Sequence, residues 1–499
     1  VFVSPHQTVN PSTRMDFESK QRRRTQTKIP VAHVVCILVM CWIPSFAFRI
    51  GVARPRPGAI SHQSFVPARP RVSRKVFQTR LASTPSSTQF PGKHKWLGGA
   101  VDSNGSIYGI PSHSQSIIRL HSPPKANVDD ADDKGMVIST YPLPLNMAQG
   151  KFKWLRGIVS GSCLYGIPAW SSSGVLKMNL IDNAISCLPV PSSVNQPNAT
   201  IYSSLETIQQ PSLKSVDTTR WMYHGASLNA DQSAIYCIPS NAQRVLKIDL
   251  ITDACDYIGP SYNGQNKFYG GILGMDGCVY GIPYTGSGVM RIDTRTDLVD
   301  ILEIPSGGAY TGEWRWHGGV YCPQNGCIYA FPSHADCVLK IDTTDTKTSG
   351  ELSLMAIERA PYDDDPVCRY KWLGGCLGVD NCIYGMPSDA NTILKIDPQT
   401  NIITTFGCLQ ELNDQVEKTF YEKNKYQGGV LCPSNGCIYA IPCNAQQVLK
   451  IDTNLNTSDG MTLFGSLLAT KDKYQGGFLG SDGCIYCIPE TAERVMKII

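Results

Sequence analysis

Apolar positions recur along this chain in short runs of strand length, and one phrase of such runs repeats from Lys95 to the last residue. A clear copy begins with Lys-Tyr-Gln-Gly-Gly-Val at Lys425, continues with Asn-Gly-Cys-Ile-Tyr-Ala-Ile-Pro ending at Pro442, and finishes with Val-Leu-Lys-Ile-Asp ending at Asp452. Self-similarity with a long fixed period is typical of solenoids and propellers. The repeat therefore predicts the architecture better than any single segment does.

The phrase occurs eight times. Every copy has a tyrosine in its second run, on average about 54 residues from the next: Tyr108, Tyr165, Tyr236, Tyr280, Tyr329, Tyr384, Tyr439 and Tyr486. A proline follows each of these tyrosines by three residues, as Pro111 follows Tyr108. Every copy also has an aromatic residue before its glycines: Trp96, Trp154, Tyr223, Phe268, Trp316, Trp372, Tyr426 and Tyr474.

Each copy predicts four antiparallel strands. The aromatic-glycine phrase is a first strand, and an Asn-Gly or Asp-Gly pair such as Asp276-Gly277 supplies a tight hairpin turn. The second strand is apolar on both faces, so it must be covered on both sides, and proline ends it. Val-Leu-Lys-Ile-Asp is the third strand, and Ile402 to Phe406 illustrates the fourth.

Repeated four-stranded units predict an all-β fold, an eight-bladed β-propeller of four-stranded antiparallel blades over residues 85–499. The alternative is seven blades, with the second or third copy acting as an insertion. Because the chain ends within the third strand of the last copy, we expect residues around Ser87 to Phe90 to supply the missing fourth strand and leave no open edge.

The double glycine, and the Ile-Asp-x-x-Thr-Asn turn from Ile396 to Asn401, resemble kelch and YVTN-type propeller repeats. The resemblance covers residues 95–499. It implies the architecture and is nearly silent on activity.

The residues before the repeats have the composition of a leader. Arg22, Arg23, Arg24 and Lys28 precede an apolar stretch from Val31 to Ile43, which is too short to span a bilayer. We therefore expect residues 1–47 to be a signal peptide with an upstream extension, cleaved near Ala47, with a signal anchor or buried helix as the alternative. No stable membrane span is expected after cleavage.

Residues 48–84 are rich in Pro and Ser, and Arg49 to Arg80 contains eight Lys and Arg but no Asp or Glu. This is the composition of a disordered transit segment. A signal peptide followed by such a segment, with the step Ala47-Phe48 between them, resembles the bipartite plastid presequences of algae with red-lineage plastids. The resemblance implies a plastid location, with secretion or the endomembrane lumen as the alternative.

The charge balance argues against a nucleic-acid partner. Residues 1–90 hold 14 Lys and Arg against 2 Asp and Glu, so the rest of the chain holds 31 basic and 39 acidic side chains. Nucleic acids and anionic membranes both attract clustered Lys and Arg, which an acidic body does not offer. With 42% hydrophobic and 17% charged residues, the chain is also too apolar for wholesale disorder.

Six cysteines occupy one repeat position, two residues before the tyrosine, where a small apolar thiol packs between blades. Cys322 with Cys327, and Cys432 with Cys437, flank four-residue hairpin tips and can form cross-strand disulfides in an oxidising compartment. Cys484 and Cys487 point to opposite faces of a strand, so no metal site is expected.

The residue before the repeat aromatic residue is basic in seven of eight copies. These side chains can form a cationic ring at one mouth of a central channel and bind an anionic ligand. Alternatively, each pairs with a nearby Asp of the Ile-Asp step, such as Asp249, and only solvates a blade edge. The seven residues are Lys95, Lys153, Lys267, Arg315, Lys371, Lys425 and Lys473.

The residue after the repeat aromatic residue differs between copies, and a site is better sought where copies disagree. His224, Tyr269 and His317 place polar rings on three successive blades, an arrangement suited to binding a sugar or aromatic ligand, or to acid-base chemistry. Gln427 and Gln475 occupy the same position in later copies. The alternative is ordinary variation at a half-exposed position.

No motif of an established catalytic class occurs, so no catalytic residue, metal or cofactor is assigned. Glu313, Asp389 and Glu490 are scattered carboxylates without an evident cluster. We expect a monomeric, non-enzymatic binding or scaffold propeller that binds a protein or a small molecule, anionic or carbohydrate, at one mouth of the ring. The alternative is a hydrolase or lactonase-like enzyme acting on a sugar or organic acid.

Overall fold

The structure of the chain is a computed structural model that describes residues 81–83, 89–121, 137–170, 174–191, 220–306, 312–344, 350–358, 369–409, 412, 423–455 and 460–498. These residues form eight four-stranded antiparallel sheets arranged as the blades of one β-propeller, as the repeat count predicts. The alternative of seven blades is therefore wrong. One short helix, α1 (Leu145–Ala148), follows the first blade.

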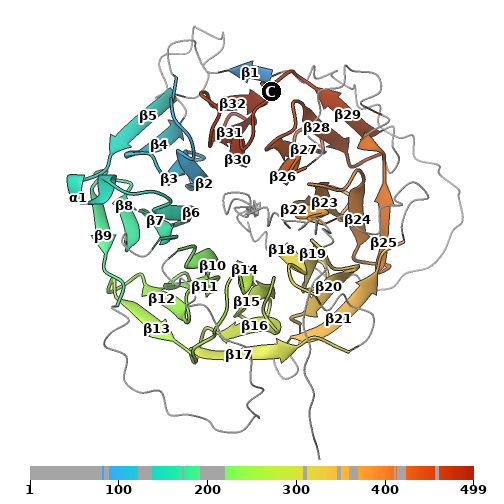
Figure 1. Ribbon diagram of the computed structural model, residues 1–499, viewed down its shortest axis with the longest axis horizontal. Coiled ribbons are helices and arrows are strands. Elements are labelled where there is room, and N and C mark those ends of the chain that lie inside the picture. Colours follow the sequence, from blue (N-terminus) through green and yellow to red (C-terminus); the bar gives the residue numbers. More distant parts are fainter. Residues whose placement is uncertain are drawn as a thin grey trace, which may run out of the picture. The chain divides into compact units, whose positions relative to one another are not determined.

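The first strand of each blade lies nearest the centre of the ring (Figure 1) and carries the repeat aromatic residue. These inner strands are β2 (Trp96–Val101), β6 (Trp154–Ser160), β10 (Tyr223–Leu228), β14 (Phe268–Leu273), β18 (Trp316–Cys322), β22 (Trp372–Leu377), β26 (Tyr426–Cys432) and β30 (Tyr474–Leu479). The second strands all end at the repeat proline: β3 (Ile107–Pro111), β7 (Cys163–Pro168), β11 (Ala234–Pro239), β15 (Cys278–Pro283), β19 (Cys327–Pro332), β23 (Ile383–Pro387), β27 (Cys437–Pro442) and β31 (Ile485–Pro489).

The two outer strands of each blade follow in chain order. The third strands are β4 (Ser116–His121), β8 (Val175–Asn179), β12 (Val245–Asp249), β16 (Gly288–Asp293), β20 (Cys337–Asp342), β24 (Ile393–Asp397), β28 (Val448–Asp452) and β32 (Met496–Ile498). The fourth strands are β5 (Val137–Pro142), β9 (Ile185–Leu188), β13 (Cys255–Ile258), β17 (Leu298–Glu303), β21 (Glu351–Ala356), β25 (Ile402–Phe406), β29 (Met461–Phe464) and, for the last blade, β1 (Leu81–Ser83).

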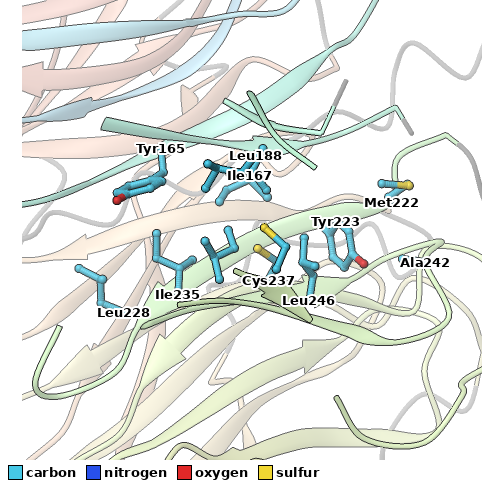
Figure 2. Close-up of a cluster of buried hydrophobic side chains, with 13 residues drawn as sticks. Tyr165, Ile167, Leu188, Met222, Tyr223, Leu228, Ile235, Cys237, Ala242 and Leu246 are labelled. Carbon is cyan, nitrogen blue, oxygen red and sulfur yellow. The ribbon is translucent and has the colours of Figure 1, made fainter. Parts of the chain in front are cut away.

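The hydrophobic core is divided into clusters that lie between neighbouring blades. Figure 2 shows the cluster between the second and third blades, where Tyr165 and Ile167 of β7 pack with Tyr223 of β10 and with Ile235 and Cys237 of β11. All six residues of β11 are buried, which confirms that the second strand is covered on both faces. Removal of this apolar area from water is the main force that holds blade to blade.

The ring is closed by the first described residues of the chain. Each inner strand contacts the next one in chain order, and β30 contacts β2. In the last blade, β1 pairs antiparallel with β32, so that Ala82 lies opposite Lys497. The expectation that Ser87 to Phe90 form this strand was wrong, because the closing strand lies a few residues earlier. Phe90 instead packs edge-on against Trp96, with 5.1 Å between ring centroids.

The hairpin tips explain why the repeat tyrosine is needed. Tyr280 donates its hydroxyl hydrogen to Asp276 Oδ2 at 2.8 Å, and Tyr384 bonds in the same way to Asp380. The turn residue thereby satisfies the polar end of a buried ring.

Two cysteine pairs stand opposite one another across their hairpins. Cys322 pairs with Cys327, and Cys432 with Cys437, in the ladder register. All four are free thiols.

Several sequence-based expectations lie outside the described residues. These are the signal peptide and almost all of the transit segment, of which only residues 81–83 are described. No helix within the described ranges has the length and apolar character needed to cross a bilayer.

Candidate functional site

The inner strands share a local irregularity that sets the direction of their side chains. In every blade the pairing of the inner strand with the second strand shifts register near the start of the inner strand. In β18, Trp316 pairs with Pro332 whereas Gly319 pairs with Ala330, so the inner strand holds one extra residue. A bulge of this kind re-aims the side chains within it. The residue after the repeat aromatic residue lies in this bulge in seven blades, and in β14 it lies directly before it, since Tyr269 still pairs with Ile282.

The residue at this position is buried in all eight blades: Leu97, Leu155, His224, Tyr269, His317, Leu373, Gln427 and Gln475. The alternative of ordinary variation assumed that this position is half-exposed. The structure shows that it is buried, so this assumption was wrong. Leucine suits a buried position, whereas His, Tyr and Gln bring polar groups that need partners there.

The structure brings His224, Tyr269 and His317 into contact, and we call these three residues the inner cluster. The His224 and Tyr269 rings are stacked, with 3.9 Å between centroids, and His317 meets Tyr269 edge-on at 4.8 Å. Tyr284, which follows β15, stacks on the other side of Tyr269 at 4.3 Å. Three successive inner strands and one loop thus build a continuous set of rings at the centre of the propeller.

The imidazole of His224, within the inner cluster, is uncharged at neutral pH. Burial holds the pKa of His224 well below its usual value, and the charges of Arg156 and His317 lower it further. Both ring nitrogens of His224 are buried and have no hydrogen-bond partner among the described residues. A neutral imidazole has one donor and one acceptor, and both groups of His224 lack a hydrogen bond within the described residues.

Arg156 is a residue of this site that the sequence analysis missed. It lies on β6, next to β10 in the ring, and its charge acts on His224. Arg156 occupies the place of the first glycine of the repeat in Trp154-Leu155-Arg156-Gly157. The sequence contained this signal, because a cation replaces a repeated glycine in only this copy.

Gln427 and Gln475 lie across the ring from the inner cluster, on the neighbouring strands β26 and β30 (Figure 1). The structure places them at the same repeat position as the inner cluster but on different blades, separated from His317 by the blade of Leu373.

Six of the seven basic residues before the repeat aromatic residues donate to backbone carbonyls. Lys267 Nζ donates to the carbonyls of Ser240, Ala242 and Gly264 at 2.7–3.0 Å. Lys95, Lys153, Arg315, Lys425 and Lys473 likewise donate to carbonyls, and Lys371 is buried at the same position. For Lys267 two of these carbonyls belong to the preceding blade, so the amine joins neighbouring blades.

These contacts replace the predicted partners. The Asp residues of the Ile-Asp step accept backbone N–H groups of their own turns, as Asp249 Oδ1 accepts from Ile251 and Thr252 at 2.9 Å. Burial lowers the pKa of Lys95, Lys153, Lys267 and Lys473 to about 8. The pairing of the lysines with these Asp residues was therefore wrong for Lys267, and the described bonds account for its amine without a ligand.

A second polar group lies where the first and last blades meet. His94 Nδ1 lies 2.5 Å from Glu490 Oε1, and Glu490 is buried. Burial raises the pKa of Glu490 to about 7, and the hydrogen bond to Glu490 raises the pKa of His94. Phe152 joins this pair to a row of rings, with centroids 5.2 Å from His94 and 4.3 Å from His113.

The other carboxylates do not join Glu490. Asp389 follows β23 and bonds to the segment before β26 of the next blade, since its Oδ1 accepts the backbone N–H of Asn424 at 2.7 Å. Within the part of the chain that the structure describes, no group of three or more His, Cys, Asp or Glu side chains could hold a metal ion.

Comparisons with known proteins are informative about the fold alone. No protein-family model and no curated protein matches the chain. Among solved structures, it is similar to a virginiamycin B lyase from Staphylococcus aureus, with a TM-score of 0.46 and 12% identity over 84% of this chain and 99% of that one. It is also similar to the hydrazine synthase of Kuenenia stuttgartiensis, with a TM-score of 0.42 and 11% identity over 83% of this chain and 98% of that one.

Proposed function

We propose that this propeller is a binding module that takes a small ring-bearing molecule on the inner cluster. The observation that supports this proposal is the contact between His224, Tyr269 and His317, whose rings replace the leucines found in other blades. A stacked aromatic surface with neutral imidazole donors and acceptors is suited to planar ligands and to sugars.

The test is a thermal-shift screen of planar amides and aryl glucosides on the full chain and on Tyr269→Leu. Leucine is the residue of this position in three other blades, so the variant is expected to fold. We expect at least one probe to raise the Tm of the wild type and not that of the variant. Gln427→Leu, at the same repeat position across the ring, is the matched control and is expected to respond like the wild type. Equal shifts in Tyr269→Leu and wild type, or no shift with any probe, would contradict the proposal.

A hydrolase or lactonase-like activity is the second candidate, and the His94–Glu490 pair supports it. A carboxyl with a pKa of about 7 can exchange protons at neutral pH, as a general acid or base must. The test is hydrolysis of small lactones and aryl esters by wild type and Glu490→Gln. Activity that is lost in the variant would support the enzyme, and equal rates at the level of buffer would contradict it.

The leader supports a plastid location. The test is the distribution of a fluorescent protein fused to residues 1–84 in an alga with a red-lineage plastid. We expect fluorescence in the plastid, and fluorescence in the endomembrane system or the medium would contradict this location.

A further inference from the structure

Arg156 occupies a repeat position whose backbone conformation favours glycine. Seven blades have glycine there, and each of these glycines has a positive φ: Gly98, Gly225, Gly270, Gly318, Gly374, Gly428 and Gly476. Arg156 adopts the same left-handed conformation, with φ 65°. A residue with a Cβ is disfavoured in this backbone conformation, and residues held in such conformations tend to occur at functional sites.

The Arg156 guanidinium also lacks the partners that a buried cation needs. Its Nε and Nη2 atoms are buried and have no hydrogen-bond partner among the described residues. Burial lowers the pKa of Arg156 to about 10, so the group stays charged at neutral pH. A buried charge without a partner is costly, and an anion that pairs with it removes much of that cost.

The two nitrogens without a hydrogen-bond partner among the described residues indicate which kind of anion fits Arg156. Nε and Nη2 form one edge of the guanidinium, and this edge binds a carboxylate through two parallel hydrogen bonds. Arg156 as a whole is partly exposed, whereas these two nitrogens are buried.

The stacked rings define the rest of the ligand. Arg156 lies next to His224 in the ring of inner strands, and His224 stacks on Tyr269. His224 contributes its own buried donor and acceptor, which also have no partner among the described residues. The stacked rings of His224 and Tyr269 therefore offer a planar surface. The Arg156 guanidinium beside them offers an edge that can bind a carboxylate.

We propose that Arg156, together with the His224–Tyr269 stack, binds an aromatic carboxylate. This inference rests on the binding role proposed above and adds the charge of the ligand to it. Arg156 holds the carboxylate, and Tyr269 with His224 holds the ring.

The experiment is isothermal titration of the full chain with three aromatic carboxylates, benzoate, cinnamate and naphthoate, each paired with its neutral amide. We expect the wild type to bind at least one carboxylate more tightly than its amide. Arg156→Gly installs the glycine of the other blades, and should weaken that carboxylate at least tenfold while leaving amide binding unchanged. Arg156→Lys keeps the charge but loses the two-pronged edge, so an intermediate affinity is expected. Arg295→Gln, at an exposed turn, is the control and should bind like the wild type.

The outcomes separate the two proposals. If the wild type binds an amide as tightly as its carboxylate, or if Arg156→Gly and Arg156→Lys both bind the carboxylate as the wild type does, the role of Arg156 is overturned while binding on the rings stands. If no carboxylate and no amide binds, the aromatic-carboxylate proposal is overturned, and the binding role is overturned with it if the aryl glucosides of the thermal-shift screen also give no shift.

Discussion

His94 in the first blade and Glu490 in the last blade are 396 residues apart in the chain, and their side chains meet with His94 Nδ1 2.5 Å from Glu490 Oε1. The ring is thus closed by a titratable pair as well as by the pairing of β1 with β32.

This pair makes stability depend on pH. The pKa of Glu490 is raised to about 7 by burial, and that of His94 is raised by the bond to Glu490. Asp472 raises both values further, whereas Lys95 lowers that of Glu490. Because both values are raised, the folded chain binds more protons than the unfolded chain, and this contribution to stability is lost as the pH rises through about 7.

We therefore expect the Tm of the wild type, measured relative to that of Glu490→Gln, to fall as the pH rises from 4.5 to about 7. Differential scanning calorimetry of both proteins over this range measures the difference. If the curves of Tm against pH run parallel for the two proteins, the His94–Glu490 pair does not titrate in this range.

The basic residues beside the repeat aromatics are expected to be structural. Lys267→Met keeps the alkyl chain but leaves three carbonyls without the ammonium donor. We expect the free energy of unfolding to fall by about 3 kcal/mol in urea titrations. Lys177→Met removes a partly exposed bond to Asp253 and should cost no more than about 1 kcal/mol. If the free energy of unfolding falls as little for Lys267→Met as for the control Lys177→Met, the structural role of Lys267 is contradicted.

The closing strand is expected to stabilise the last blade. A chain that starts at residue 86 lacks β1 and leaves the edge of β32 unpaired, whereas a chain that starts at residue 79 keeps β1. The shorter chain should have the lower Tm and should associate at high concentration, since an open strand edge can pair with another chain. Calorimetry and light scattering compare the two, and identical behaviour would contradict the role of β1.

Arg156 is expected to cost stability. Arg156→Gly relieves a left-handed backbone and removes an unpartnered buried charge, so the free energy of unfolding should rise by about 1 kcal/mol. Gly374→Ala, at the same repeat position with φ 74°, should lower it by a similar amount. Urea unfolding of both variants measures the changes. A decrease for Arg156→Gly would mean that Arg156 contributes more to folding than its described contacts indicate.

The eight blades could be predicted from the sequence because every copy contains the same local signals: an aromatic residue, a hairpin turn and a strand that ends at proline. The three-residue strand β1 could not be located, because so short a segment has no apolar pattern of its own.

The site was less predictable because it depends on contacts between distant residues. Variation at one repeat position was enough to select His224, Tyr269 and His317, which do meet. The partners of Lys267 are backbone carbonyls, which every sequence offers at every residue, so no residue type indicates them. Arg156 was detectable as a broken glycine pattern, but its missing hydrogen bonds become visible only in the folded chain.

The most direct measurement of the binding proposal is a crystal structure of the protein soaked with bromobenzoate, in which the anomalous signal of bromine locates the ligand. We predict a bromine peak beside the ring of Tyr269, with the carboxylate of the same molecule on Nε and Nη2 of Arg156. A bromine peak only at the outer surface of the blades, or a carboxylate turned away from Arg156, would contradict the account.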